Sequence, residues 1–87
     1  MTEREKHINL LLRRIPNSPG VYQYLNKEGQ IIYIGKAKNL QRRVNSYFSK
    51  VHTNAKTRQL VAHIADIHYI VVDNEQDAFL LENNLIK

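Results

Sequence analysis

Two short runs of β-forming residues, separated by a four-residue turn, most constrain what this chain can fold into. Residues 21–25 alternate in polarity, and residues 30–35 contain an Ile-Ile-Tyr-Ile run. The Asn-Lys-Glu-Gly sequence between them is typical of a hairpin loop. The pattern therefore predicts two antiparallel strands joined by residues 26–29.

Further elements are indicated on both sides of this hairpin. Thr2 and Glu5 have the spacing of a capping box, and Pro16 is expected to stop the helix that follows. A β-branched run at 67–72 predicts a third strand.

Three more helices are predicted where a cap residue precedes apolar positions in helical phase. The caps are Asn39, residues 53–54 and residues 73–74. The resulting order is helix, two strands, two helices, strand, helix. This order predicts an α+β fold, a small three-stranded antiparallel sheet flanked by helices.

Length and composition indicate one small domain spanning residues 1–87. The absence of cysteine excludes disulfides, thiolate metal sites and cysteine nucleophiles. No apolar run approaches the roughly 20 residues that span a bilayer, so we expect a soluble cytoplasmic protein that does not enter a membrane. Because apolar periodicity continues to Lys87 without a C-cap residue, we expect the domain to be a fragment of a longer multidomain protein.

Positive charge is concentrated in the centre of the chain. Residues 29–65 contain seven basic and no acidic side chains, whereas the rest carries six basic and eight acidic ones. This asymmetry indicates a polyanionic partner, nucleic acid first and an anionic membrane surface second, unless it only keeps the protein soluble. The candidate phosphate-binding residues are Lys38, Arg42, Lys50, Lys56 and Arg58.

Tyr22 and Tyr33 lie on the two strands of the predicted hairpin. A cross-strand aromatic pair most often serves packing. Gly35 nevertheless indicates close approach by another backbone or a ligand, and Lys36 provides an ammonium beside a phenol. Neighbouring cations favour the phenolate form of tyrosine, so we expect a phenol here that can act as a base.

Arg43 and Tyr47 are four residues apart and therefore neighbours on one face of a predicted helix. A guanidinium can bind two phosphate oxygens at once. The alternatives are a surface arginine and a core role for the Tyr47 ring.

Glu82 interrupts the apolar stripe of the last predicted helix. A carboxylate in a core-facing stripe needs a cation, a metal or a dense set of donors. One alternative is an ion pair with Arg or Lys. The other is a magnesium ion, which one or two carboxylates can bind while it keeps several waters.

These residues resemble the GIY-YIG nuclease superfamily, and within it the N-terminal domain of the bacterial UvrC excinuclease family. The paired signature is formed by Gly20-Val21-Tyr22 and Tyr33-Ile34-Gly35-Lys36. Val21 stands where the signature usually has Ile, a common variant in the excinuclease branch. Matching blocks follow in the same order: Gly35-Lys36-Ala37-Lys38-Asn39-Leu40, Arg43-Val44, Ser46-Tyr47-Phe48 and residues 80–87.

The resemblance implies a divalent-metal-dependent endonuclease that cuts on the 3′ side of damage during nucleotide excision repair. Carried over position by position, the active-site residues of the family fall on Tyr22, Tyr33, Lys36, Arg43 and Tyr47. Its metal ligand falls on Glu82, which would bind one Mg²⁺ or Mn²⁺. The sequence leaves open whether Tyr22 or Tyr33 is the general base, and Gly20 and Gly35 are expected to be structural.

The implied partners are damaged double-stranded DNA and, in the full-length protein, UvrB and indirectly UvrA. No nucleotide cofactor is expected, because no Walker-type loop or dinucleotide fingerprint is present. Family sequences continue beyond the position of Lys87, so residues 1–87 alone are expected to be weakly active or inactive.

Three other functions remain open on the sequence alone. The domain could be a DNA-binding module in which the tyrosines only pack, or a protein-interaction module with a nuclease-like fold. It could also be a GIY-YIG nuclease of another branch, such as a restriction or homing enzyme.

Overall fold

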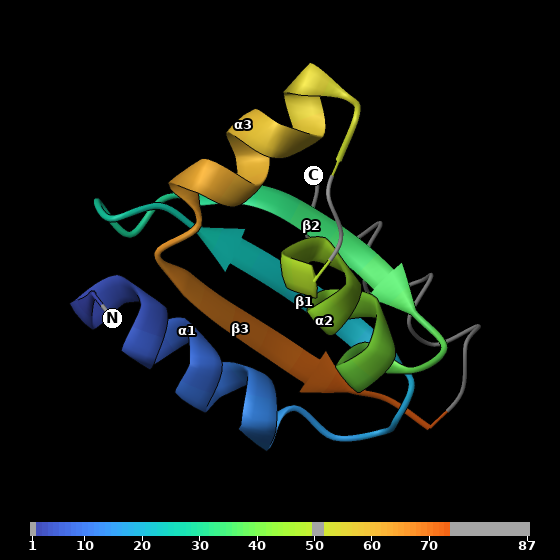
Figure 1. Cartoon of the computed structure of the whole chain (residues 1–87). Helices are drawn as coiled ribbons and strands as arrows, with labels where there is room; N and C mark the ends of the chain where they lie inside the picture. The colour runs from blue at the N-terminus through green and yellow to red at the C-terminus, as the bar shows by residue number, and fades with distance from the viewer. Residues whose placement is uncertain (1, 50–51, 74–87) are drawn as a thin grey trace.

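The computed structural model describes residues 2–49 and 52–73, which form a sheet with helices packed on it (Figure 1). The elements are α1 (Glu3–Arg14), β1 (Gly20–Leu25), β2 (Ile31–Ala37), α2 (Leu40–Ser49), α3 (Ala55–His63) and β3 (Asp66–Val71). Their order and the α+β class confirm the prediction for this part of the chain. The last predicted helix, with Glu82, lies outside the described residues.

β1 is the central strand of an antiparallel sheet with the order β2-β1-β3. Tyr22 lies opposite Gly35 on β2 and opposite Tyr69 on β3. β2 extends two residues beyond the predicted strand, because Lys36 and Ala37 pair with the beginning of β1. This extension places Lys36 within the sheet rather than after it.

Local hydrogen bonds determine where the hairpin turns. The side-chain oxygen of Asn26 accepts hydrogen bonds from the backbone N–H groups of Glu28 and Gln30. Gly29 adopts a φ of 81°, in the left-handed region that favours glycine. The predicted loop at residues 26–29 is therefore confirmed.

The helix boundaries also follow local chemistry. The side chains of Thr2, Asn39 and Asn54 each accept a hydrogen bond from a backbone N–H in the first turn of the following helix. α1 ends at Arg14, shortly before Pro16, as expected from the missing N–H and fixed φ of proline. Within residues 2–49 and 52–73, no helix has the length and apolar character to span a bilayer.

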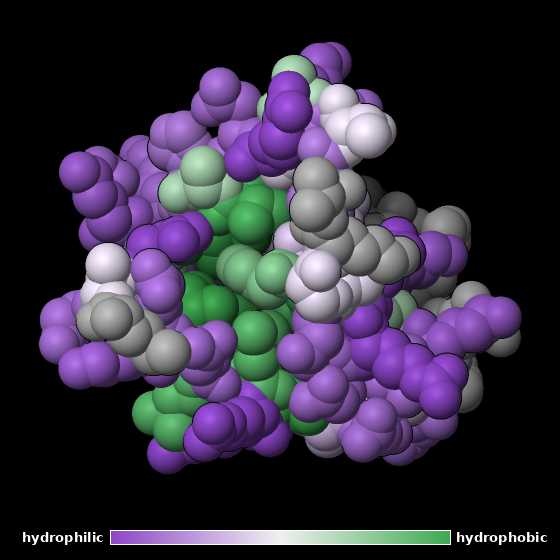
Figure 2. Space-filling view, viewed as in Figure 1, coloured by the Kyte–Doolittle hydropathy of each residue, from purple (hydrophilic) through white to green (hydrophobic). Residues whose placement is uncertain are grey.

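The core lies between one face of the sheet and helices α1 and α2 (Figure 1). Its fully buried side chains include Tyr22, Tyr24, Leu40, Val44 and Ile64. No residue within α3 is fully buried, but Leu60 and Val61 are half-buried and pack against the core, and Ile64, just after the end of the helix, is fully buried. Figure 2 shows a band of apolar surface framed by α1, α2 and α3, with hydrophilic residues around it.

Candidate active site

Four tyrosines gather on the core face of the sheet. Tyr22 and Tyr24 project to the same face of β1, Tyr33 lies opposite Tyr24 on β2, and Tyr47 comes from α2. The ring centroid of Tyr22 is 5.2 Å from that of Tyr24, 6.1 Å from that of Tyr33 and 6.0 Å from that of Tyr47. We call these four residues the tyrosine cluster. It brings together the three tyrosines that the sequence analysis proposes as catalytic.

The members of the tyrosine cluster differ in their access to solvent. Tyr22 and Tyr24 are 0% exposed, Tyr47 is half-buried and Tyr33 is 39% exposed. The hydroxyl oxygens of Tyr22 and Tyr47 are 3.2 Å apart and form a hydrogen bond. Tyr33 is therefore the phenol of the cluster most accessible to a reactant, and Tyr47 connects it to the buried Tyr22.

Two glycines leave the space that this packing needs. A Cβ atom at Gly35 would overlap the ring and hydroxyl of Tyr22, and one at Gly20 would overlap the Ile70 carbonyl oxygen and the Leu40 side chain. Neither position has room for a side chain.

Arg43 reaches the tyrosine cluster from α2, one turn before Tyr47. A hydrogen bond with the Tyr22 phenol raises the pKa of Arg43. Burial raises the pKa of Tyr22, and the hydrogen bonds from Tyr47 and Arg43 oppose this effect without cancelling it. Arg43 thus acts on Tyr22 with the sign expected of a cation.

The other two tyrosines proposed as catalytic, Tyr33 and Tyr47, are also kept neutral. The hydrogen bond with Tyr47, followed by burial, raises the pKa of Tyr33. Burial, followed by the hydrogen bond with Tyr22, raises the pKa of Tyr47. Arg43 lowers the pKa of these phenols, as expected of a neighbouring cation, but in the described residues burial and mutual hydrogen bonding outweigh this effect.

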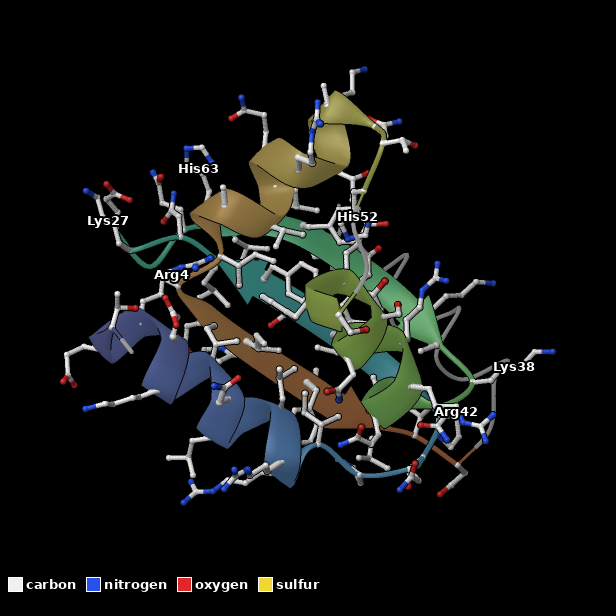
Figure 3. The ribbon with its side chains drawn as sticks, in the orientation of Figure 1. Arg4, Lys27, Lys38, Arg42, His52 and His63 are labelled. Atoms are coloured by element: carbon white, nitrogen blue, oxygen red, sulfur yellow. The ribbon has the colours of Figure 1, made fainter. Side chains whose placement is uncertain are left out.

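A cleft of about 510 Å³ opens beside Arg43. It is lined by the end of β2 and the first turns of α2, with the residues Lys36, Ala37, Lys38, Asn39, Arg42, Arg43 and Ser46. We call it the basic cleft, because four of its lining side chains among the described residues are cationic and none of these lining residues is acidic. Lys38 and Arg42 lie at the same corner of the molecule in Figure 3. Since Arg43 lines the basic cleft and contacts Tyr22, an anion bound there would lie beside the tyrosine cluster.

Anion binding in the basic cleft depends on side chains rather than on the N-terminus of α2. The backbone N–H of Leu40 donates to the Ser18 carbonyl oxygen, and that of Gln41 donates to the Pro16 carbonyl oxygen. The next N–H, that of Arg42, donates to the side chain of Asn39. These donors are already bonded, so the lysine and arginine side chains must supply the attraction for a phosphate.

The remaining predicted residues lie elsewhere. Lys56 and Arg58 are on α3 and do not line the basic cleft. Lys50 and Glu82 fall outside the described residues. The sequence analysis did not propose Tyr24, although its alternation with Tyr22 places both on one face. It also did not propose His52, which follows α2 and carries no periodic signal.

The described part of the site suits a phosphate better than a bare divalent cation. Residues 2–49 and 52–73 contain no group of three or more His, Asp or Glu side chains that could bind a metal. A hard cation such as Mg²⁺ takes oxygen ligands and usually at least one carboxylate. The phenols are oxygen donors, so a carboxylate would have to come from another part of the chain, where Glu82 is the predicted ligand.

Comparison with known proteins gives a consistent family assignment. Residues 18–87 match the family model for the UvrC-like GIY-YIG domain. The chain is 66% identical to UvrABC system protein C of Bacteroides thetaiotaomicron, over 99% of this chain and 15% of that protein. The identity to the Porphyromonas gingivalis protein of the same name is 59%, over 92% of this chain and 13% of that protein. The chain therefore spans only a small part of these relatives.

Solved structures show the same similarity. The N-terminal GIY-YIG endonuclease domain of UvrC from Thermotoga maritima, with magnesium as its catalytic divalent cation, is 41% identical with a TM-score of 0.80. The match covers 99% of this chain and 90% of that one. A point mutant of the same domain, with phenylalanine in place of one tyrosine, also binds the cation and is 40% identical with a TM-score of 0.80, over 99% of this chain and 89% of that one. The antiparallel sheet and helices described above have the fold of that domain.

Proposed function

This chain belongs to the UvrC-like GIY-YIG family and is an endonuclease domain of the UvrC type, and from this premise we propose that it makes the 3′-side incision in nucleotide excision repair. The observation that carries the proposal is the junction at Arg43, where the basic cleft meets the tyrosine cluster. Because Arg43 lines the cleft and is bonded to the Tyr22 phenol, a phosphate bound in the cleft would lie beside the tyrosine cluster.

Damaged double-stranded DNA is the proposed substrate. The basic cleft supports phosphate binding without sequence selection, because contacts to phosphates position a protein but do not read bases. Lesion selection would then come from partners, and the names of the relatives support the UvrABC system as their source. We assign UvrB as the direct partner and UvrA as an indirect one, in the cytoplasm.

Glu82 is our candidate ligand for one Mg²⁺ or Mn²⁺. The Thermotoga maritima domain, which binds magnesium, supports the need for a divalent cation. When bound, the cation would stabilise the charge on the leaving 3′ oxygen and favour ionisation of a nearby phenol.

The cationic side chains of the site have separate proposed roles. Arg43 neutralises charge that develops on the non-bridging phosphate oxygens, for which its guanidinium geometry is suited. Lys36 lines the basic cleft and would add positive charge where a phosphate binds. Lys38 and Arg42 bind flanking phosphates, and Lys50, Lys56 and Arg58 would extend this contact along the DNA.

Tyr33 is our candidate for the general base. It is 39% exposed, whereas Tyr22 is 0% exposed and already bonded to Tyr47 and Arg43. Tyr33 can therefore contact a water molecule, and Tyr22 supports the hydrogen-bond network from the buried side of the tyrosine cluster. Tyr47 positions the phosphate or the water through its hydroxyl group.

The experiment is a nicking assay with the full-length protein that carries this domain, together with its UvrABC partners and damaged duplex DNA. We expect Glu82→Gln and Arg43→Ala each to reduce 3′ incision by at least about 100-fold, because each removes charge stabilisation from the transition state. Incision on the 5′ side should persist, because the family resemblance implies that another domain of the full-length protein makes that cut.

Glu28→Gln is the matched control for Glu82→Gln. Glu28 is exposed in the hairpin loop and does not line the basic cleft. Its removal changes the net charge by the same amount and should leave 3′ incision intact. Normal 3′ incision by Glu82→Gln or Arg43→Ala would contradict the proposal.

A further inference from the structure

His52 contacts Tyr47 although it lies beyond the end of α2. Its Nε2 atom is 2.8 Å from the backbone carbonyl oxygen of Tyr47. Its ring centroid is 6.3 Å from that of the Tyr47 ring, at an interplanar angle of 42°. His52 is half-buried, whereas the other histidines in the described residues are exposed. Figure 3 shows His52 beside α2, while His63 projects outward from α3.

The carbonyl oxygen of Tyr47 is a natural acceptor for this side chain. α2 ends at Ser49, so Tyr47 carries one of the last four carbonyl groups, which have no donor within the helix. A carbonyl oxygen only accepts, so Nε2 carries a proton in neutral His52 as well as in the imidazolium form. The hydrogen bond therefore exists in both protonation states.

The opposite end of Tyr47 is also bonded. Its hydroxyl oxygen is 3.2 Å from that of Tyr22, which is fully buried and cannot move without disturbing the core. Tyr47 is thus fixed at its backbone and ring by His52, and at its hydroxyl by Tyr22. A tyrosine bonded at both its backbone carbonyl and its hydroxyl is more sharply positioned than one bonded at its hydroxyl alone.

We propose that His52 is a positioning residue that acts through Tyr47, by fixing the end of α2 and with it the Tyr47 phenol at the reacting phosphate. The inference rests on the proposed nuclease function and deepens it. His52 does not take the proton from water in this role, because the nitrogen that faces Tyr47 already donates to a carbonyl group.

The test compares His52→Ala with His52→Gln in the full-length protein and its partners. The Nε2 atom of glutamine can donate to the same carbonyl oxygen, whereas alanine cannot. We expect His52→Ala to lower kcat for 3′ incision roughly tenfold with little change in KM for DNA, and His52→Gln to retain most of the rate. Equal losses in the two variants would overturn the proposal, as would an unchanged rate in His52→Ala.

His63→Ala is the matched control. The Nδ1 atom of His63 lies 2.7 Å from the carbonyl oxygen of Gln59, on the exposed surface of α3. This variant loses the same kind of bond far from Tyr47 and should incise at the normal rate. If His52→Ala does not fold, His52→Leu, which keeps side-chain volume but has no donor, replaces it.

A double-mutant cycle separates positioning from a general structural role. If His52 acts through the Tyr47 hydroxyl, His52→Ala should have little further effect in a Tyr47→Phe background. An effect of the same size in both backgrounds would overturn the proposal. Arg43→Ala is measured in parallel. Normal incision by that variant contradicts the proposed function itself, whereas its inactivity beside a fully active His52→Ala rejects only the role of His52.

Discussion

Gly35 lies opposite Tyr22 in the hairpin, and the Tyr22 ring fills the space that a side chain at position 35 would need. Because Tyr22 is fully buried, its ring cannot turn into solvent. Any added atom must shift either the ring or strand β2. The first shift would move the Tyr22 hydroxyl relative to that of Tyr47, and the second would move Tyr33, which β2 carries, relative to both. The geometry of the tyrosine cluster therefore depends on a residue that supplies no functional group.

Gly35→Ala is therefore expected to impair both stability and activity. Overpacking of this kind lowers the free energy of unfolding by about 1–3 kcal/mol. The rate of 3′ incision should fall further than the loss of folded protein explains, because the phenols are displaced. Denaturant titration measures the stability, and nicking under conditions where the variant is fully folded measures the rate.

Gly29→Ala provides a matched control for that experiment. Gly29 has a φ of 81°, and no atom lies within 4 Å of the position that a Cβ would take. Alanine is strained there only through its backbone, which costs about 1 kcal/mol. This variant should be destabilised but incise normally once folded. If Gly35→Ala also incises normally, the position of the Tyr22 ring does not matter for the reaction.

Helix α3 is fixed by contacts at its C-terminal end as well as by Leu60 and Val61, which are half-buried against the core. Arg4 of α1 donates from Nε to the Ile64 carbonyl oxygen at 2.9 Å and from Nη2 to the Val61 carbonyl oxygen at 2.7 Å. Figure 3 shows Arg4 directed from α1 toward this end of α3. A cation is also favoured there by the helix dipole. Arg4 thus links two helices that are distant in the sequence.

Arg4→Ala is expected to loosen α3 selectively. The loss of partly exposed hydrogen bonds should lower the free energy of unfolding by about 1 kcal/mol. Backbone amides of α3 should exchange with solvent faster, and those of α2 should keep their protection, as measured by hydrogen exchange. Arg13→Ala, an exposed arginine near the other end of α1, is the control. Unchanged α3 exchange in Arg4→Ala would show that the helix is fixed by other contacts.

At the scale of elements, boundaries set by local chemistry could be predicted and those set by distant partners could not. Thr2, Asn39 and Asn54 were identified as caps because a cap bonds to residues only two or three positions away. The end of β2 was predicted two residues short, because its last residues pair with the start of β1. The apolar phase predicted for α3 is confirmed, since its apolar side chains pack against the core.

At the scale of the whole molecule, the resemblance to the family supplied the predicted site residues. The register of β1 and β2 explains why the tyrosines of these two strands meet on one face of the sheet. Their roles stay predictions, as does that of Glu82. The effect of a neighbouring cation on the tyrosine pKa values could be predicted, but their net rise could not, because burial and mutual hydrogen bonds are properties of the packed molecule. The contact from His52 to Tyr47 could not be predicted either, since no sequence pattern indicates that these two side chains meet.

The basic residues of the central segment lie on different elements of the fold, which the sequence does not reveal. Lys38 and Arg42 line the basic cleft, whereas Lys56 and Arg58 lie on α3. Lys27 is located at the opposite end of the molecule from Lys38 and Arg42 (Figure 3). If the cleft binds the DNA backbone, these basic residues should contribute unequally to affinity.

A salt series tests this inequality. Each phosphate neutralised on duplex DNA contributes about 0.9 to the slope of log affinity against log salt. The double substitution of Lys38 and Arg42 by Gln should reduce the slope by roughly 2 and weaken binding equally for all sequences, because phosphate contacts carry no base information. Fluorescence anisotropy with duplex DNA measures both quantities.

The control is the double substitution of Arg13 and Lys27 by Gln, which removes the same charge from residues that do not line the basic cleft. Long-range attraction alone would weaken DNA binding similarly in both double variants, since it depends on net charge. Direct neutralisation of phosphates lowers the slope only where a side chain contacts the backbone. A slope that falls equally in the two variants would therefore mean that net charge, and not the basic cleft, determines how this domain binds DNA.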